Sequence, residues 1–286
     1  MARILDGKQI ASELKENIAL EIAKLKEQSI VPGLAVVLVG EDPASKVYVG
    51  HKEKACQALG IHSEVIRLAE TITTQELLVQ IKQLNQRSDI HGILVQLPLP
   101  QQLDEQRIIE SVSPDKDVDG FHPINVGLLS LGRKTFVPCT PRGIMEMLKF
   151  SAIDVAGKHA VIIGRSNIVG KPLAALLLAQ NATVTVCHSH TVNLAQVTKE
   201  ADILIAAVGK GRFVTENMVK QGAIIIDVGI NREGKKLVGD VDFDEVEQVA
   251  SAITPVPGGV GPLTIMMLMA NTIEAAKRRA LCNKAK

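Results

Sequence analysis

Hydrophobic and polar positions alternate along the chain with two periods. Ile10, Leu14 and Ile18 recur every four residues, a spacing that predicts an amphipathic helix continuing to Leu25. Short apolar runs predict strands, because the strands of a parallel sheet are buried on both faces. In the first half of the chain these runs predict strands at 34–39, 63–68 and 93–95, separated by helices at 45–59 and after Thr73.

The pattern loosens between about residues 98 and 141, where Pro, Gly and Asp are frequent. We place a domain boundary in this segment. A second alternating series follows it, with predicted strands at 160–163, 183–186, 203–208, 223–227 and 252–253, and with a long final helix at about 264–281.

Strands that alternate with helices indicate right-handed crossovers around a mainly parallel sheet. We therefore predict an α/β protein of two domains. The N-terminal α/β substrate domain covers 1–120 and is completed by the C-terminal helix, 264–286. A Rossmann-like nucleotide domain covers 140–263. The length of 286 residues agrees with two domains, since one domain usually has about 100–200 residues.

Charge and aromatic content argue against two classes of partner. The 32 Lys and Arg against 31 Asp and Glu leave a net charge of +1, which provides no overall attraction to nucleic acid or anionic lipid. One Tyr, five Phe and no Trp leave few rings on which bases could stack. Apolar runs such as Leu173–Ala179 are far shorter than the ~20 residues that span a bilayer. We expect no nucleic-acid partner and no membrane association.

The N-terminus and the cysteines favour the cytoplasm. Arg3 and Asp6 stand where a secretory signal would be apolar. The 4 Cys are scattered without a C-x-x-C pair, so neither a disulfide framework nor a zinc site is expected. His188 and His190 form an H-x-H pair without further ligands nearby in the sequence. We therefore expect a cytoplasmic protein with no metal.

A predicted strand, a glycine turn and a helix start follow one another at 161–173. Pro172 fits an early helical position, where its missing N–H costs little. Free N–H groups at a helix start favour a phosphate, so the turn at Gly164 is a candidate nucleotide-binding loop. The spacing of Gly164 and Gly170 is not the full G-x-G-x-x-G pattern, and an ordinary tight turn is the alternative.

An acidic residue is missing where an NAD site would need one. Such a residue usually stands about 20 residues after the loop and binds the ribose hydroxyls. No Asp or Glu occurs between Asp154 and Glu200, and the next predicted strand runs into Ser189 and its two His neighbours. Arg165 lies in the loop itself. Cationic and hydroxyl donors suit a 2′-phosphate, which predicts NADP as the cofactor.

Tyr48 and Lys52 stand four positions apart, so they share one face of a predicted helix. A phenol beside an ammonium can share hydrogen bonds, and Lys serves in proton transfer. A packed Tyr beside a solvated Lys is the alternative. Gln96 follows a buried strand at its carboxyl end, where open α/β sheets bind ligands, and its amide can orient a Lys or a substrate. The alternative for Gln96 is a surface position ahead of a Pro-rich turn.

The segment Asp115–Gly120 matches the opening of a calcium loop, D-x-D-x-D-G. Position twelve of that loop is Val126 in place of the bidentate Glu, so we reject calcium. Asp119 can instead bind the paired N–H groups of a polar heterocycle. Farther along, the Gly- and Pro-rich segment 254–264 lets a ligand approach the backbone closely, and a rigid connector is the alternative.

Together these segments resemble the bifunctional methylenetetrahydrofolate dehydrogenase/methenyltetrahydrofolate cyclohydrolase family. The resemblance covers nearly the whole chain in the same order, which makes it specific. The motifs that carry it are Tyr48-x-x-x-Lys52, Val95 to Pro100, Asp115 to Pro123, Pro138 to Pro141, Gly164 to Ser166 with Val169 to Pro172, Asp227 to Asn231, and Pro257 to Pro262.

The resemblance implies two sequential reactions at a cleft between the domains. In the first, 5,10-methylenetetrahydrofolate gives a hydride to NADP+ and becomes the methenyl cation. In the second, water adds to that carbon and the ring opens to 10-formyltetrahydrofolate. The implied partners are tetrahydrofolate one-carbon derivatives, the implied cofactor is NADP, and the implied assembly is a homodimer.

The resemblance also implies roles for individual residues. Lys52 is the general acid/base of the cyclohydrolase step, and Gln96 orients it. Tyr48 aligns the pterin ring, and Asp119 anchors its amino edge. The implied cofactor-binding residues are Gly164, Arg165, Ser166 and Ser189, with Ile230 beside the nicotinamide, and the implied folate pocket also includes Pro257, Gly258 and Gly259.

Three alternatives stay open at this point. A shikimate-type NADP-dependent dehydrogenase has the same domain order but gives no reason for the segments 96–100 and 257–262. A catalytically silent NADP- or folate-binding regulator would not need the intact Lys52. A cyclohydrolase without dehydrogenase activity would keep the cofactor loop. The sequence departs from the family at Gly211, where Pro is frequent, which predicts a slightly different loop near the cofactor.

Overall fold

The computed structural model describes residues 1–234 and 236–284, which form two compact units. The six-stranded unit comprises Met1–Ser12 and Thr140–Thr264. The three-stranded unit comprises Glu13–Cys139 and the chain from Ile265 onward. The division falls inside two long helices, α1 (Gly7–Glu27) and α10 (Val260–Lys284).

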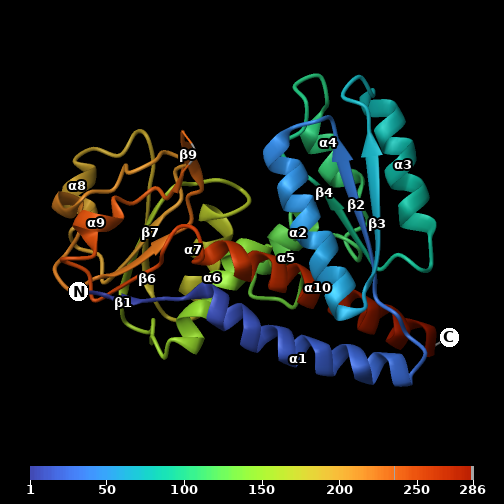
Figure 1. Ribbon diagram of the computed structural model, residues 1–286, viewed down its shortest axis with the longest axis horizontal. Coiled ribbons are helices and arrows are strands. Elements are labelled where there is room, and N and C mark those ends of the chain that lie inside the picture. The colour runs from blue at the N-terminus through green and yellow to red at the C-terminus, as the bar shows by residue number, and fades with distance from the viewer. Residues whose placement is uncertain (235, 285–286) are drawn as a thin grey trace. The chain divides into compact units, whose positions relative to one another are not determined.

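The three-stranded unit is built on a parallel sheet with the order β3-β2-β4. The central strand β2 (Gly33–Val39) is buried along its whole length, as its continuous apolar run predicts. It is flanked by β3 (His62–Leu68) and β4 (Gly92–Val95). Helices α2 (Pro43–Leu59) and α3 (Thr74–Gln86) connect the strands and lie beside the sheet in Figure 1. The strands and helices predicted for this part of the chain are confirmed.

Local sequence defines the ends of α2, the helix that carries Tyr48 and Lys52. The Asp42 carboxylate accepts a hydrogen bond from the Ser45 N–H at 2.7 Å, and Pro43 occupies the first turn. Gly60 ends the helix with a left-handed φ of 72°, a conformation that costs glycine little. The face of α2 is therefore fixed in register from both ends.

The segment between residues 98 and 141 contains helices that the hydrophobic pattern did not predict. They are α4 (Glu105–Ser111), α5 (Pro123–Ser130) and the first turn of α6 (Cys139–Phe150). Helices α4 and α5 are short and begin at the capping side chains of Asp104 and His122. The Pro and Asp residues that suggest a loop are in part helix-starting residues here.

The six-stranded unit holds a fully parallel sheet in the order β1-β11-β8-β7-β5-β6. From β5 the chain moves to β6 on one side and then returns to β7 on the other, so a topological switch point lies between β5 and β7. The strands are β1 (Arg3–Ile4), β5 (His159–Ile163), β6 (Thr183–Cys187), β7 (Ile203–Ala206), β8 (Ile224–Asp227) and β11 (Ala252–Ile253).

Shorter elements complete this unit. Helix α7 (Gly170–Ala179) follows β5, and α8 (Leu194–Thr198) follows β6. A 3-10 turn η1 (Glu216–Met218) precedes β8, and α9 (Phe243–Val246) precedes β11. The antiparallel hairpin of β9 (Asn231–Glu233) and β10 (Lys236–Val238) was not predicted, because its strands have three residues each.

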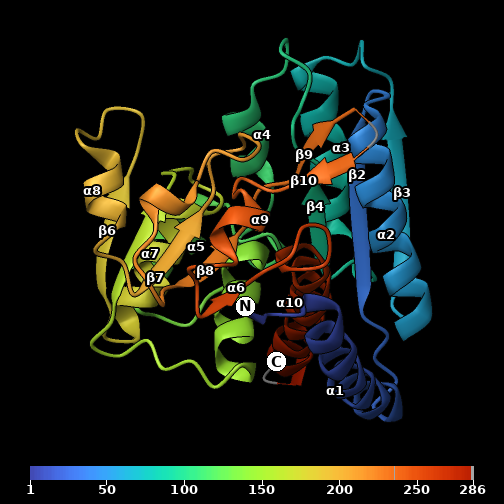
Figure 2. The same ribbon diagram turned by 60° about the vertical axis from the view of Figure 1, so that its left-hand side comes forward.

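The two ends of the chain belong to different units. Arg3 pairs in parallel with Ala252, so the first residues extend the six-stranded sheet, whereas the sequence analysis assigned them to an N-terminal domain of 1–120. A strand of two residues leaves no hydrophobic pattern to read. The last helix joins the three-stranded unit, where Lys277 pairs with Glu21 of α1 at 2.9 Å and the two helices run side by side in Figures 1 and 2.

Candidate active site and cofactor pocket

Lys52 and Gln96 meet in the three-stranded unit. Lys52 Nζ donates a hydrogen bond to Gln96 Oε1 at 2.9 Å. The Gln96 amide is itself fixed, because its Nε2 donates to the Leu97 carbonyl oxygen at 2.6 Å and its main-chain N–H donates to the Val37 carbonyl oxygen at 2.9 Å. The amide oxygen is therefore directed at the ammonium group. The sequence predicted both residues for one site, and the structure brings them together.

Tyr48 lies one helical turn before Lys52 on α2. Its side chain is 37% exposed, which leaves part of the ring available to a ligand. Burial of the remainder raises the pKa of the Tyr48 hydroxyl, so this group stays neutral near pH 7. A neutral phenol with an accessible ring is suited to stacking and to hydrogen bonding beside the Lys52 ammonium.

Asp119 stands close enough to Lys52 for the two charges to interact. Burial raises the pKa of the Asp119 carboxyl to about 6, and the positive charge of Lys52 opposes this rise. Asp119 is ionised above pH 6 and can then accept two N–H donors side by side. The structure therefore places the predicted anchor near the predicted acid/base.

Asp117 organises the turn that contains Asp119, a role that was not predicted from the calcium pattern or from the motif at 115–123. The buried Asp117 carboxylate accepts the main-chain N–H groups of Gly120 (3.1 Å) and Phe121 (3.2 Å) through Oδ1, and that of His122 (2.8 Å) through Oδ2. These bonds use the oxygens that a cation would need. Among residues 1–234 and 236–284, no group of three or more His, Cys, Asp or Glu side chains is arranged to hold a metal ion.

Asn271 supports the same turn and was missed by the sequence analysis. Its buried Nδ2 donates to the Val118 carbonyl oxygen at 2.7 Å and to the Val137 carbonyl oxygen at 3.0 Å, and it lies 3.6 Å from Cys139 Sγ. The Cys139 thiol donates to the Val118 carbonyl oxygen at 3.4 Å. A polar Asn within the apolar stretch of α10 is the feature of the sequence that could have revealed this role.

The glycine turn of the six-stranded unit leaves no room for side chains. Gly164 has a φ of 126°, and a Cβ there would lie 2.2 Å from the Ala207 carbonyl oxygen. A Cβ on Gly170 would lie 2.1 Å from the Gly164 carbonyl oxygen. The Ser166 hydroxyl accepts the N–H groups of Val169 (3.1 Å) and Gly170 (3.4 Å) at the start of α7. The two glycines thus allow a tight turn between β5 and α7, and the start of a helix is a place where main-chain N–H groups can bind a phosphate.

A cavity of about 530 Å³ opens at the carboxyl ends of β5, β6 and β7, at the switch point of the sheet. Gly164, Arg165 and Ser189 line it, so the structure brings together three of the predicted cofactor residues. Lys210 also lines it, with its ammonium 5.3 Å from the centre of the Phe213 ring. Lys210 was not predicted as a site residue; it directly precedes Gly211, where the sequence departs from the family.

Ile230 and the loop at 257–261 form a second group in the same unit. The Ile230 side chain is 45% exposed, and a Cβ added to Gly261 would lie 3.8 Å from its Cδ1 atom. A Cβ on Gly259 would lie 2.6 Å from the Pro255 carbonyl oxygen, so the loop packs its backbone tightly. The predicted residues Ile230, Pro257, Gly258 and Gly259 therefore occupy one region of the six-stranded unit.

Comparison with known proteins shows the family of this chain. Residues 5–119 match the catalytic-domain model of tetrahydrofolate dehydrogenase/cyclohydrolase, and residues 138–280 match its NAD(P)-binding-domain model. The chain belongs to the tetrahydrofolate dehydrogenase/cyclohydrolase family. It is similar to the bifunctional protein FolD of Halalkalibacterium halodurans, with 58% identity over 96% of this chain and 99% of that protein.

Two solved structures of the family agree with the fold. The bifunctional FolD of Campylobacter jejuni has a TM-score of 0.95 and 52% identity, covering 98% of this chain and 100% of that one. The FolD of Trypanosoma brucei, solved with NADP and an inhibitor, has a TM-score of 0.94 and 37% identity, with 98% of each chain covered.

Membership of the tetrahydrofolate dehydrogenase/cyclohydrolase family confirms the predicted function. The chain is a methylenetetrahydrofolate dehydrogenase and methenyltetrahydrofolate cyclohydrolase with an NAD(P)-binding domain. The predicted α/β fold with a mainly parallel sheet is confirmed as well. The family does not favour a shikimate-type dehydrogenase or a silent regulator. Among the described residues, none of the helices combines the length and the apolar character needed to cross a membrane.

Proposed function

We propose that Lys52 is the general acid/base of the cyclohydrolase step, with Gln96 as its orienting partner. The observation that carries this proposal is the hydrogen bond of 2.9 Å between Lys52 Nζ and Gln96 Oε1. Addition of water to the methenyl carbon releases a proton, and opening of the ring requires one at nitrogen. A single positioned amine can serve both transfers. The Gln96 oxygen accepts one N–H bond and so fixes the direction of the Lys52 nitrogen. In its amine form this nitrogen has a lone pair that can take the proton from water, and the ammonium so formed can give a proton to the ring nitrogen.

Tyr48 and Asp119 are proposed to hold the pterin ring during both steps. The partly exposed Tyr48 ring offers an apolar face, and the Asp119 carboxylate offers two acceptor oxygens for the N–H groups of the amino edge. Hydride transfer needs mainly the alignment of two rings, because the product cation is delocalised over two nitrogens. No strong acid is required for that step.

Gly164, Arg165, Ser166 and Ser189 are proposed to hold NADP, which supplies a hydride acceptor when bound. Gly164 and Gly170 pass so close to neighbouring backbone that a Cβ on either would clash, so the strand and the start of α7 are joined by a tight turn, and the free N–H groups of a helix start suit a pyrophosphate. Arg165 and Ser189 line the same cavity and are suited to the 2′-phosphate. We further propose that Ile230 lies against the nicotinamide and that Pro257, Gly258 and Gly259 contribute to the folate pocket.

We also propose that the protein is a cytoplasmic homodimer. Strand β6 is the outer strand of the six-stranded sheet, so one row of its backbone N–H and C=O groups is left unpaired within the sheet. Such an edge is suited to a second copy of the chain. Sedimentation of the purified protein tests the dimer, and a monomer at micromolar concentration would contradict it.

Affinity for the folate substrate is expected to fall in acid through Asp119. The pKa of this carboxyl is about 6 in the free protein, so below pH 6 it is protonated and loses its role as a double acceptor. The KM for 5,10-methylenetetrahydrofolate should be constant above pH 7 and should rise about tenfold per pH unit well below 6, because binding is then coupled to loss of one proton.

The matched control is Asp119→Asn, which keeps the shape of the side chain but cannot titrate. Its KM should be raised at every pH and should not vary between pH 5 and pH 8. A variant with the same acid-dependent rise as the unmodified protein would assign the titration to another group.

A further inference from the structure

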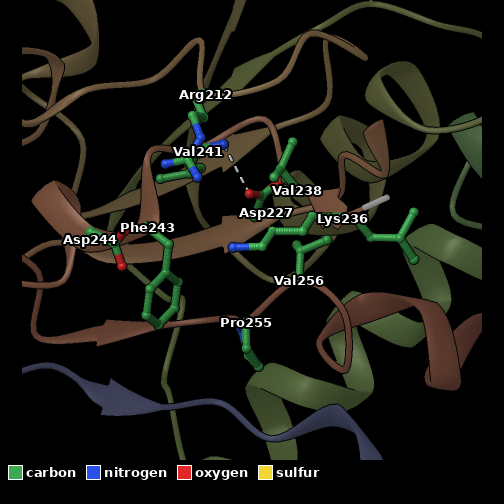
Figure 3. A pocket seen from close by; sticks show the side chains of 11 residues that line it. Arg212, Asp227, Lys236, Val238, Val241, Phe243, Asp244, Pro255 and Val256 are labelled. Carbon is green, nitrogen blue, oxygen red and sulfur yellow. Dashed lines mark hydrogen bonds between the residues drawn. The ribbon is translucent and has the colours of Figure 1, made fainter. Parts of the chain in front are cut away.

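Two buried carboxylates, Asp227 and Asp240, have no place in the function proposed so far. Asp227 ends β8 and is 4% exposed, and Asp240 follows β10 and is fully buried. Buried carboxylates are costly unless they are hydrogen-bonded, so each must be used by the structure around it. Asp227 borders a cavity of about 260 Å³, and Figure 3 shows its side chain between Val238 and Val241.

Asp240 accepts hydrogen bonds from three consecutive main-chain N–H groups. Its Oδ2 accepts from Val208 at 2.6 Å and from Gly209 at 2.9 Å, and its Oδ1 accepts from Lys210 at 2.8 Å. Successive N–H groups that converge in this way form a concavity that binds anions. Here the protein fills that concavity with its own carboxylate, which fixes the shape of the loop after β7.

The same carboxylate also holds the segment after β8. Asn231 Nδ2 donates to Asp240 Oδ1 at 2.9 Å, directly beside Ile230 in the chain. A Cβ on Gly229 would lie 2.2 Å from Asp240 Oδ1, so only glycine allows the backbone to pass this close. Asp240 therefore ties together two segments, one of which carries Lys210 and the other Ile230.

Asp227 fixes Asp240 in turn. Its Oδ1 accepts the main-chain N–H of Asp240 at 2.9 Å, and its Oδ2 accepts that of Val241 at 2.9 Å. The Asp227 main-chain N–H is bound by Thr254 Oγ1 at 2.7 Å. The position of Asp240 is thus anchored to the central strand β8, which is a rigid part of the sheet.

We propose that Asp240 is a positioning residue for the NADP site, one that sets the cofactor-facing loop at 208–210 and the Ile230 segment by a single buried carboxylate. Val208 and Lys210 line the cavity that also contains Arg165 and Ser189. The inference rests on the proposed function, because it takes that cavity as the binding site for NADP. Asp240 touches no cofactor atom itself and acts through the two segments that it holds.

The decisive variant is Asp240→Asn. In the unmodified protein, main-chain N–H donors face both oxygens of Asp240. In the variant an NH2 group replaces one of these oxygens and cannot accept a hydrogen bond, so part of the loop must move. We expect the Kd for NADPH and the KM for NADP+ to rise about tenfold or more, since bonds to a charged acceptor are lost. The cyclohydrolase rate measured on methenyltetrahydrofolate without NADP should stay within about twofold, because Lys52 and Gln96, the residues proposed for its proton transfers, belong to the other unit.

Two further variants make the test specific. Asn231→Ala removes one of the four donors and should raise the Kd for NADPH by about threefold, and it serves alone if Asp240→Asn does not fold. Asp202→Asn is the matched control. Asp202 directly precedes β7, and its carboxylate also accepts a main-chain N–H, that of His159, at 2.9 Å. The NADPH affinity of this variant should equal that of the unmodified protein.

Fluorescence titration of NADPH with the full-length protein gives these constants. An Asp240→Asn variant that binds NADPH with unchanged affinity would overturn the inference, and so would an equal loss of cyclohydrolase and dehydrogenase activity. If Asp240→Asn does not fold, unchanged NADPH affinity in Asn231→Ala would overturn it. Failure of the unmodified protein to bind NADPH would instead overturn the proposed cofactor site, so the two failures are distinguishable.

Discussion

Replacement of Lys52 by Met is expected to abolish cyclohydrolase activity while dehydrogenase activity remains measurable. Methionine keeps the length and apolar stem of the side chain but has no proton to give or accept. Loss of a general acid/base costs typically about 10²–10⁴-fold in rate. The hydride step should survive, because it depends on alignment of the substrate with the cofactor. The two rates are measured separately, by hydrolysis of methenyltetrahydrofolate and by formation of NADPH.

Lys54→Met is the matched control for this experiment. Lys54 lies on the same helix and is exposed, so its replacement removes an equal charge outside the pair of Lys52 and Gln96. Both activities of this control should equal those of the unmodified protein. Equal loss of both activities in a folded Lys52→Met variant would contradict the division of roles.

Replacement of Arg165 by Ala is expected to weaken NADP+ selectively. If the guanidinium binds the 2′-phosphate, its loss should raise the KM for NADP+ by about tenfold to a hundredfold, as for a charge-assisted hydrogen bond. The KM for NAD+, which has no such phosphate, should change little. The measurement is the ratio of kcat/KM for the two cofactors.

Lys158→Ala provides the control for Arg165→Ala. Lys158 is an exposed cation of the same unit, but it stands at the amino end of β5. The cavity lies at the carboxyl end of that strand. Its replacement should leave the cofactor ratio unchanged. An Arg165→Ala variant that loses NAD+ and NADP+ activity equally would show that the Arg165 side chain does not bind the 2′-phosphate.

Most of the fold could be predicted from the sequence because the longer helices and strands have a clear pattern of apolar positions. The apolar runs of β2 and β5 and the four-residue spacing in α1 are examples. Short elements could not be predicted in this way. Strand β1 has two residues and is defined by its pairing with β11, a contact between positions far apart in the chain. Tertiary pairing of this kind leaves no local pattern.

The site could be predicted where chemistry is carried by a recognisable side chain. Lys52, Gln96 and Asp119 stand out as polar groups within motifs, and the structure brings the first two into contact. Asp240 and Asn271 could not be assigned a role from the sequence, because each acts by binding main-chain groups of distant segments. Only the folded chain shows which segments those are.

We expect this chain to oxidise 5,10-methylenetetrahydrofolate with NADP+ as the preferred acceptor. The deciding measurement is the rate of cofactor reduction by the purified protein, determined in parallel with NADP+ and with NAD+. We expect clear turnover with NADP+ and a much lower kcat/KM with NAD+, as the cationic cavity of Arg165 and Ser189 implies. Turnover with NAD+ alone would contradict the assignment of that cavity, and no turnover with either would contradict the dehydrogenase activity itself.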